Sequence, residues 1–417
     1  MPVTTKLPPA VAVQLPVAQE IMDRCHHLAQ ITEQPEQICR TYLTAAHKEA
    51  NTTVAEWMAA AGLNPRIDPA GSVVGESDPQ KALTLVIGSH LDTIPNAGAY
   101  DGILGVMVAV SAAAALDLQT LPFNLEVIGF GEEEGVRFGT TLMTSKARAG
   151  QWDDRWWDLQ DQEGVSLRSA HQAFGLDAQE MSRACPDKKL LGYLEVHIEQ
   201  GPVLEAENLS VGIVTGIAAA QRFKLHLQGQ AGHAGTVPMH LRKDALVGAA
   251  ACVQRINEIA RDHQMVATVG QLVPRPGGVN VIPGAVEFSL DVRCLDEAQL
   301  QRCVDEINTA CQTIADRSGL EFKSEQIHSA GAAHCAEILQ QAWAKQIEAL
   351  GERPFYLASG AGHDAMVMAE LCDIGMLFLR CAGGISHNPA ESVTVEDVAW
   401  AYTVLLHTLN QLAQDYG

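Results

Sequence analysis

The order of apolar and polar positions predicts an α/β fold in the first part of the chain. Residues about 17–62 are typical of two helices, one of them over Ile38–Leu63, where Ala, Met and Leu recur at helical spacing. The runs 83–90 and 125–135 are strand-like and end in loops, and they flank an apolar helical run at 103–116. Apolar strands that alternate with helices indicate a parallel sheet covered by helices.

The pattern changes near residue 210. Strand-like and helical segments now follow in the order strand, helix, strand, strand, helix, strand, which is typical of a small α+β sandwich of the ferredoxin-like kind. These segments are 210–235, 242–261, 265–273, 286–293, 297–319 and 321–329. Beyond Gly331 helices and buried strands resume, including a strand that ends in a loop at 374–384.

We therefore expect one α/β domain built from residues 1–210 and 330–417, interrupted by an inserted α+β domain at 211–329. The acidic stretch 151–164, which contains three tryptophans, is interpreted as a surface excursion. The run 103–116 is too short to cross a membrane, which takes about 18 apolar residues or more. It reads as a buried helix.

Composition and charge narrow the range of partners that the chain is expected to bind. The chain has 417 residues with 28 Lys and Arg against 50 Asp and Glu, so the formal charge is 28 − 50 = −22. This balance disfavours nucleic acid, which is bound mainly by basic surfaces. No segment predicts a membrane span, so we expect a small-molecule substrate. Ten scattered cysteines without paired spacing, and an N-terminus without an unbroken apolar stretch, favour the cytoplasm.

Five short motifs place metal-binding side chains just after a strand or in a glycine-rich loop. Each alone has an ordinary explanation, such as a hydrogen-bonded histidine or a solvated acidic turn. Their shared position at one expected sheet edge, where ligands collect in α/β folds, favours a metal site. The motifs are GSHLDT (His90, Asp92), YDGILG (Asp101), GEEEG (Glu132, Glu133, Glu134), EVHIEQGP (His197, Glu199, Gln200) and GGISHNPAE (His387, Glu391).

Two details of these motifs support the binding of a cation. Asp92 stands two residues after His90, so its carboxylate can accept the second imidazole N–H and support His90 as a metal ligand. The three consecutive carboxylates 132–134 repel one another, and burying them without a cation would cost several kcal/mol each.

These motifs, together with GQAGHAGTVPMHLRKDAL, GGVNVIPGAVEFSLDVR and SGAGHDA, resemble the M20-type metal-dependent amidohydrolases in the same order over nearly the whole chain. The branch that they resemble contains N-carbamoyl-L-amino-acid hydrolases, β-ureidopropionase and allantoate amidohydrolase. The resemblance implies a mixed-sheet, metallopeptidase-like catalytic domain with an inserted lid and dimerisation domain.

The resemblance also implies two divalent cations per subunit, Zn²⁺ or Mn²⁺, bridged by Asp101. His90 and His197 would complete one site, and Glu134 and His387 the other. Such mixed nitrogen and oxygen ligands suit both metals. In peptidase relatives the position of His197 is normally a carboxylate, so a histidine here favours the carbamoylase branch.

The remaining roles follow from the same resemblance. Glu133 matches the general base, and His233 matches an oxyanion-stabilising histidine that comes from the partner subunit of a homodimer. Substrate contacts are expected from Gln200, Asn280, Arg293 and His363. Glu132 is interpreted as a solvated or hydrogen-bonded turn residue and Arg242 as a surface or interface arginine. His363 and Asp364 are expected to have a support or substrate role and not to bind metal.

The expected activity is hydrolysis of a ureido C–N bond in a small carboxylic acid, with release of ammonia and CO₂. The candidate substrates are allantoate and an N-carbamoyl-L-amino acid. Two alternatives stay open: a peptidase or aminoacylase of the same fold, and a catalytically inactive homologue that acts by binding.

Overall fold

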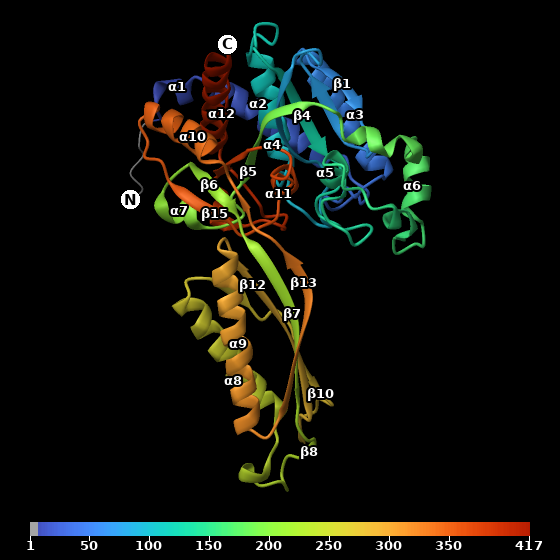
Figure 1. Cartoon of the computed structure of the whole chain (residues 1–417), viewed down its shortest axis with the longest axis vertical. Coiled ribbons are helices and arrows are strands. Elements are labelled where there is room, and N and C mark those ends of the chain that lie inside the picture. Colours follow the sequence, from blue (N-terminus) through green and yellow to red (C-terminus); the bar gives the residue numbers. More distant parts are fainter. Residues whose placement is uncertain (1–6) are drawn as a thin grey trace. The chain divides into compact units, whose positions relative to one another are not determined.

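A computed structural model describes residues 7–417, so the first six residues of the expected segment 1–210 lie outside the described part. The chain forms two compact units (Figure 1). The first unit comprises Met1–Thr215 and His334–Gly417, and the second comprises Gly216–Ala333. No helix among residues 7–417 is long and apolar enough to cross a membrane.

A nine-stranded mixed sheet forms the centre of the first unit. Its order is β1-β2-β4-β3-β5-β16-β6-β14, and β15 pairs with β6. The strands are β1 (Asn64–Ile67), β2 (Val73–Glu76), β3 (Leu83–His90), β4 (Asn124–Phe130), β5 (Lys189–Ile198), β6 (Val211–Ile217), β14 (Ala333–His334), β15 (Tyr356–Ser359) and β16 (Ile374–Leu379).

The predicted strands at 83–90, 125–130 and 374–379 and their parallel pairing are confirmed. β3 pairs in parallel with β4 and with β5, and β16 pairs in parallel with β5. These strands are buried over most of their length because helices cover the sheet. Their carboxyl ends share one edge, which brings His90 and His197 to the same side of the molecule.

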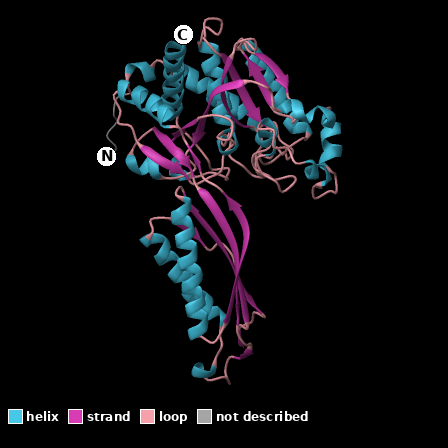
Figure 2. Ribbon diagram, viewed as in Figure 1, coloured by secondary structure: helices cyan, strands magenta, loops and turns pink. Residues whose placement is uncertain are grey.

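The helices of the first unit surround this sheet (Figure 2). The central one is α4, whose apolar residues 103–110 are all buried against β3 and β5, as the run 103–116 predicts. The helices are α1 (Pro9–Ala12), α2 (Leu15–Ala29), α3 (Ala45–Ala60), α4 (Ile103–Ala115), α5 (Met143–Arg148), α6 (Leu167–Phe174), α7 (Val203–Glu207), α10 (Glu337–Ala349), α11 (Ala365–Met368) and α12 (Val395–Tyr416). Short 3₁₀ turns lie at Asp154–Asp158, Ala178–Ala184 and Ala382–Gly384.

The second unit is an antiparallel sheet with two helices on one face. The sheet order is β10-β12-β7-β13, with β9 beside β12, and both helices pack on it through a separate apolar core. The elements are β7 (Ala219–Gln228), β8 (Gly232–His233), a 3₁₀ turn (Met239–Leu241), α8 (Ala245–Asp262), β9 (Val266–Thr268), β10 (Leu272–Arg275), β11 (Val281–Ile282), β12 (Ala285–Cys294), α9 (Glu297–Arg317) and β13 (Glu321–Ala330). This arrangement is α+β with ferredoxin-like strand order.

Three local interpretations of the sequence are wrong. The helix expected over Ile38–Leu63 begins only at Ala45, because Leu43 has a left-handed backbone (φ 57°) and the Thr44 side chain caps the helix. The strand expected over 210–235 is divided: β6 pairs with β16 in the first unit, and β7 belongs to the second. The stretch 151–164 is not only surface, since Trp157 is buried in an apolar cluster with Phe138 and Phe174.

Candidate metal centre

The loop at the start of α4 brings Asp101 to the end of β3. Gly102 caps this helix with φ 75°, and a Cβ atom at this position would lie 2.4 Å from the ring of His90. Only glycine therefore fits between the carboxylate and the imidazole. The sequence YDG and the strand end GSH are thus two parts of one site.

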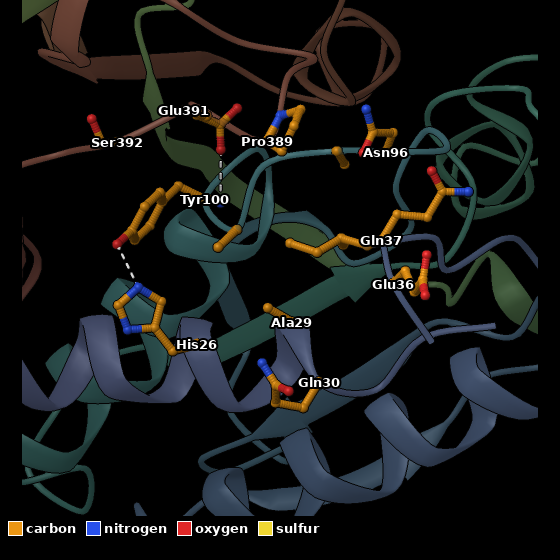
Figure 3. A pocket seen from close by; sticks show the side chains of 13 residues that line it. His26, Ala29, Gln30, Glu36, Gln37, Asn96, Tyr100, Pro389, Glu391 and Ser392 are labelled. Atoms are coloured by element: carbon orange, nitrogen blue, oxygen red, sulfur yellow. Dashed lines mark hydrogen bonds between the residues drawn. The ribbon is translucent and has the colours of Figure 1, made fainter. Parts of the chain in front are cut away.

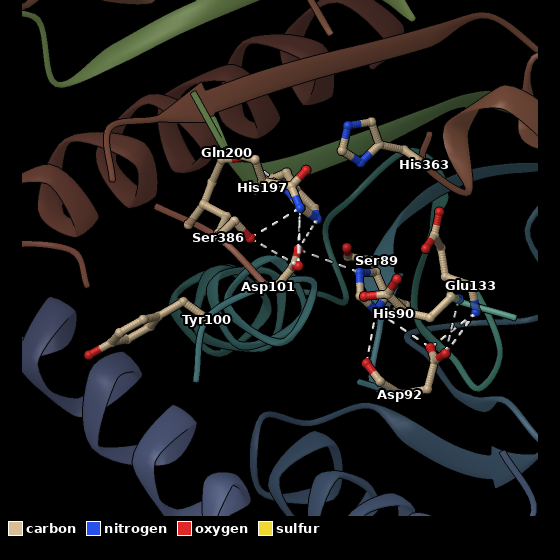
Figure 4. Close-up of polar contacts among 12 residues, drawn as sticks. Ser89, His90, Asp92, Tyr100, Asp101, Glu133, His197, Gln200, His363 and Ser386 are labelled. Atoms are coloured by element: carbon tan, nitrogen blue, oxygen red, sulfur yellow. Dashed lines mark hydrogen bonds and ion pairs between the residues drawn. The ribbon is translucent and has the colours of Figure 1, made fainter. Parts of the chain in front are cut away.

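Asp101 lies beside His90 and His197 (Figure 4), and His387 is its third histidine neighbour. Its Oδ1 is 3.3 Å from Nε2 of His197 and 3.9 Å from Nε2 of His90. Its Oδ2 is 3.1 Å from Nε2 of His387, which is in turn 3.5 Å from Oε1 of Glu134. The structure therefore brings together all five residues that the sequence proposes as metal ligands.

These five residues form two groups that share Asp101. One group is His90, Asp101 and His197, and the other is Asp101, Glu134 and His387; within each group the potential ligand atoms lie within 4.8 Å of one another. His197 Nε2 is buried and has no hydrogen-bond partner, as expected for a nitrogen that faces a metal ion. Both donor sets combine imidazole nitrogen with carboxylate oxygen, so they fit Zn²⁺ or Mn²⁺.

The buried carboxylates of the site also favour the binding of cations. Burial, together with the charges of neighbouring carboxylates, raises the pKa of Glu133 well above its usual range and that of Glu134 to about 7. Burial alone would raise the pKa of Asp101 too, but the hydrogen bond with His387 and the charges of the histidines lower it. Divalent cations would offset the repulsion among these carboxylates.

Asp92 holds the acidic loop in a way that the sequence did not predict. Its carboxylate accepts the backbone N–H groups of Glu133 and Glu134, at 3.1 Å. The nearest partner of His90 Nδ1 is the Asp92 backbone carbonyl at 3.0 Å, whereas the carboxylate lies 3.4 Å away. Asp92 therefore orients His90 mainly through its main chain and positions Glu133 and Glu134 through its side chain.

Glu132 behaves as a turn residue, although it is buried and not solvated. Its Oε1 accepts the N–H of Gly135 at 2.5 Å, and only 1% of the residue is exposed. Glu133 and Glu134 are half-buried and point away from this turn toward the histidines. This difference separates the structural carboxylate from its two neighbours.

Gln200 and His363 lie beside the candidate ligands. The Gln200 amide donates to both oxygens of Asp101 at 3.0 Å, and its backbone is left-handed with φ 56°. The His363 ring stands edge-on to that of His197, with centroids 4.5 Å apart, and its Nε2 is 2.8 Å from Ser359 Oγ. Burial lowers the pKa of His363 well below its usual value, so the neutral form is favoured.

Two further residues were missed by the sequence reasoning. The Ser386 hydroxyl lies 3.2 Å from Asp101 Oδ2, and its position directly before His387 could have marked it. Arg40 is buried, and its Nε donates to the carbonyl of Leu91, between His90 and Asp92, at 2.7 Å. Nothing in the local sequence marks Arg40, because the contact joins residues 51 positions apart.

The other predicted site residues belong to the second unit. His233 and Asn280 are exposed and close together, because β8 pairs with β11 and the N–H of Ala234 donates to the Asn280 carbonyl. Arg293 lies near the far end of β12, where its Nε and Nη2 contact the Asp291 carboxylate at 2.8 and 3.1 Å. Eight residue-to-residue steps of extended strand lead from Ala285 to Arg293, about 27 Å at about 3.4 Å per step.

Arg242, interpreted from the sequence as a surface or interface arginine, also forms hydrogen bonds within its own loop. Its guanidinium donates to the carbonyls of Val237 and Ala234, at 3.0 and 2.6 Å. These bonds close the loop that begins at His233. Arg242 therefore stabilises the conformation of the loop that carries this histidine.

With this geometry in place, comparison with known proteins defines the family. Residues 86–411 match the family described as Peptidase family M20/M25/M40, and the chain belongs to it. The N-carbamoyl-L-amino acid amidohydrolase of Geobacillus stearothermophilus is 38% identical, over 95% of this chain and 98% of that protein. The allantoate deiminase of Arabidopsis thaliana is 35% identical, over 94% of this chain and 81% of that protein.

Solved structures agree with the sequence relatives. An amidase of the hydantoinase/carbamoylase family from Burkholderia multivorans superposes with a TM-score of 0.89 at 32% identity, covering 95% of this chain and 98% of that one. The structure described as AtUAH in complex with glyoxylate has a TM-score of 0.75 at 31% identity, with the same coverage. The expected branch of the family and the α/β fold class with a mixed sheet are thereby confirmed.

Proposed function

We propose that this chain is a binuclear metal-dependent amidohydrolase that cleaves a ureido C–N bond in a small carboxylic acid. The reaction is R–NH–CO–NH₂ + H₂O → R–NH₂ + CO₂ + NH₃. The observation that carries the proposal is Asp101, shared by two ligand groups beside Glu133. The amidohydrolase relatives at 35–38% identity support the substrate class, with allantoate and N-carbamoyl-L-amino acids as the candidates.

In this proposal His90, Asp101 and His197 hold one divalent cation, and Asp101, Glu134 and His387 hold the other. Zn²⁺ and Mn²⁺ both suit these ligands. When bound, the two cations would polarise the ureido carbonyl and make water a better nucleophile. The chain's own residues would then orient the substrate and move protons.

Glu133 is proposed as the group that moves the proton. A carboxylate Oε of Glu133 takes a proton from the attacking water and delivers it to the nitrogen that leaves. The hydrogen bond from its backbone N–H to Asp92 holds the residue beside the ligand Glu134. The raised pKa of Glu133, caused first by burial, suits a group that must both accept and release a proton.

The substrate contacts are proposed to come from two copies of the chain. Along β12, Ala285 lies about 27 Å from Arg293, and His233 and Asn280 lie beside the segment that leads into Ala285, so within one unit they are at the opposite end of this strand from Arg293. We propose a homodimer in which Arg293 of one copy grips the substrate carboxylate while His233 and Asn280 of the other bind the ureido oxygen. Gln200 and His363 complete the site from the first unit.

The second unit carries features that fit such an assembly. β13 is an edge strand of its sheet, ten residues long and exposed at most positions. An exposed edge strand of this length can pair with the same strand of a second copy. We therefore propose the segment 211–329 as the lid and dimerisation domain.

The two alternatives make different predictions. An inactive homologue is disfavoured because His90, Asp101, Glu134, His197 and His387 are all present and brought together. A peptidase or aminoacylase of the same fold would hydrolyse a dipeptide or an N-acetyl amino acid without releasing ammonia. We also propose a cytoplasmic location, supported by ten cysteines that are all free thiols.

The decisive experiment is an ammonia-release assay with protein reconstituted with Zn²⁺ or Mn²⁺. The substrates are allantoate, several N-carbamoyl-L-amino acids, β-ureidopropionate and a dipeptide. We expect ammonia from allantoate or from a carbamoyl amino acid and none from the dipeptide. Protein that binds metal but releases no ammonia from any ureido compound would contradict the proposal.

A further inference from the structure

Glu391 is a buried carboxylate that joins two loops of the candidate metal centre. It lies between β16 and α12 and is 6% exposed. Its Oε1 accepts the backbone N–H groups of Tyr100 and Asp101 at 2.9 and 3.2 Å, and its Oε2 accepts the hydroxyl of Ser386 at 2.9 Å. One of these loops carries Asp101, and the other carries His387 directly after Ser386.

The contacts on the Asp101 loop are tight. A Cβ atom at Gly98 would lie 2.3 Å from both Cδ and Oε1 of Glu391, so this loop passes directly over the carboxylate. The same loop is anchored on its other side, where the Tyr100 hydroxyl lies 2.8 Å from Nε2 of His26 (Figure 3). These contacts fix the position of the Tyr100–Asp101 backbone relative to Glu391.

The contact on the His387 loop extends to Asp101 itself. The Ser386 hydroxyl lies within hydrogen-bond distance of both Glu391 Oε2 and Asp101 Oδ2. His387 has a left-handed backbone with φ 54° and is exposed, and its ring lies against Asp101 and Glu134. A single side chain therefore links the bridging carboxylate to the most exposed candidate ligand.

We propose that Glu391 is a positioning residue that sets the distance between Asp101 and His387 and thereby the affinity for the cation between them. This proposal rests on the proposed metal-dependent function. Glu391 neither binds the cation nor touches the substrate in this assignment. The reach of its side chain, rather than its charge, is the property that matters, because its bonds go to backbone N–H groups and a hydroxyl.

Two conservative variants separate reach from charge. Glu391→Gln keeps the length: the amide oxygen accepts the N–H groups of Tyr100 and Asp101, and the amide nitrogen donates to Ser386 Oγ. Glu391→Asp keeps the charge but ends about 1.5 Å short, one C–C bond, so it cannot reach both loops. The measurement is the dissociation constant for Zn²⁺, and separately for Mn²⁺, by competition with a chromophoric chelator on metal-free protein.

We expect the dissociation constants of Glu391→Gln to stay within about threefold of the wild-type values. For the more weakly bound of the two ions, Glu391→Asp should raise the dissociation constant about tenfold or more. Asp68→Ala is the matched control: Asp68 is a buried carboxylate that accepts the N–H groups of Ala70 and Ser72, both at 2.9 Å. This control should lower the melting temperature of the metal-free protein without changing the dissociation constants.

Three results would overturn the proposal: Glu391→Asp binding as tightly as the wild type, Glu391→Gln weakened as much as Glu391→Asp, or Asp68→Ala weakened to the same extent as Glu391→Asp. Failure of the wild type to bind either metal is a different result, because it contradicts the proposed function itself. Intact wild-type binding with unaffected Glu391 variants contradicts only the positioning role.

Discussion

Three of the residues proposed to bind metal are held differently by the fold from the proposed substrate residues of the second unit. In the first unit His90, Asp101 and His197 are at most 4% exposed. His90 and His197 lie at the ends of buried strands, and both lie close to Asp101 in the loop before α4. In the second unit His233, in the two-residue strand β8, and Asn280, in a turn, are exposed, and Arg293 is half-buried near the opposite end of β12.

This difference follows from what each group has to do. Metal ligands need fixed distances, which rigid strands and buried hydrogen bonds supply. Groups that must meet a substrate stay accessible, and loops on a rigid scaffold serve this purpose. The first unit therefore contains its candidate metal centre completely, whereas in our proposal the second unit acts together with another copy of the chain.

The largest effect is expected from the shared ligand. Asp101→Ala should lose both ions and all detectable activity, whereas His387→Ala should retain about one ion per chain, because the His90–His197 group remains. Metal content after dialysis, measured by mass spectrometry, checks both variants. Two ions retained in Asp101→Ala would show that this residue is not the bridge.

Glu133→Gln should lower kcat by about 10²–10⁴-fold, because the amide cannot take a proton from water. Metal content should stay near two ions per chain, since Glu133 is not assigned as a ligand. Initial rates of ammonia release and metal analysis of the same sample test this. Retained activity would remove Glu133 from the proton-transfer role.

Mixing two inactive variants tests whether the substrate residues of the second unit come from two copies of the chain. His233→Ala and Arg293→Ala should each be nearly inactive, but a re-equilibrated equal mixture should recover about a quarter of the wild-type activity. Half of the dimers are then mixed, and one of the two sites in each has both residues. No recovery, with subunit exchange verified by native mass spectrometry, would place both residues in the site of one chain.

The smallest effect concerns stability and pH in the first unit. Burial lowers the pKa of His47 from 6.5 to about 4, so the folded state favours neutral imidazole. This contribution is fully present above pH 6.5 and is lost as the pH falls from 6.5 toward 4. The full loss is about 3.5 kcal/mol, because the pKa falls by about 2.5 and a pKa change of one corresponds to about 1.4 kcal/mol.

His47→Gln should therefore flatten the pH dependence of the free energy of unfolding between pH 7 and pH 4, measured by urea denaturation. His240→Gln, at an exposed histidine of the second unit, is the control and should leave the wild-type slope unchanged. A wild-type slope in His47→Gln would mean that this histidine does not titrate in the expected range.

The sequence predicted the parts of this protein that depend on local pattern. The strands ending at His90 and at Leu379 and the buried helix after Asp101 follow from runs of apolar residues, and the candidate ligands follow from polar residues at their ends. The ferredoxin-like order of the second unit was also visible, because its strands alternate and its helices have clear apolar faces.

Contacts between distant segments could not be predicted in this way. Arg40 beside Leu91, and Glu391 beneath Asp101, join residues that share no pattern in the sequence. The assignment of β6 to the first sheet was missed because β6 and β7 read as one alternating run. The separation of His233 from Arg293 became visible only once the register of β12 against β7 was known.

The close approach of Gly102 to His90 has a consequence for engineering. Replacing glycine near the start of a helix is a common route to higher thermal stability. At this position even a methyl group would displace the imidazole, and the φ of 75° adds strain to any other residue. A thermostability campaign that accepts Gly102→Ala on melting temperature alone would select against the metal centre.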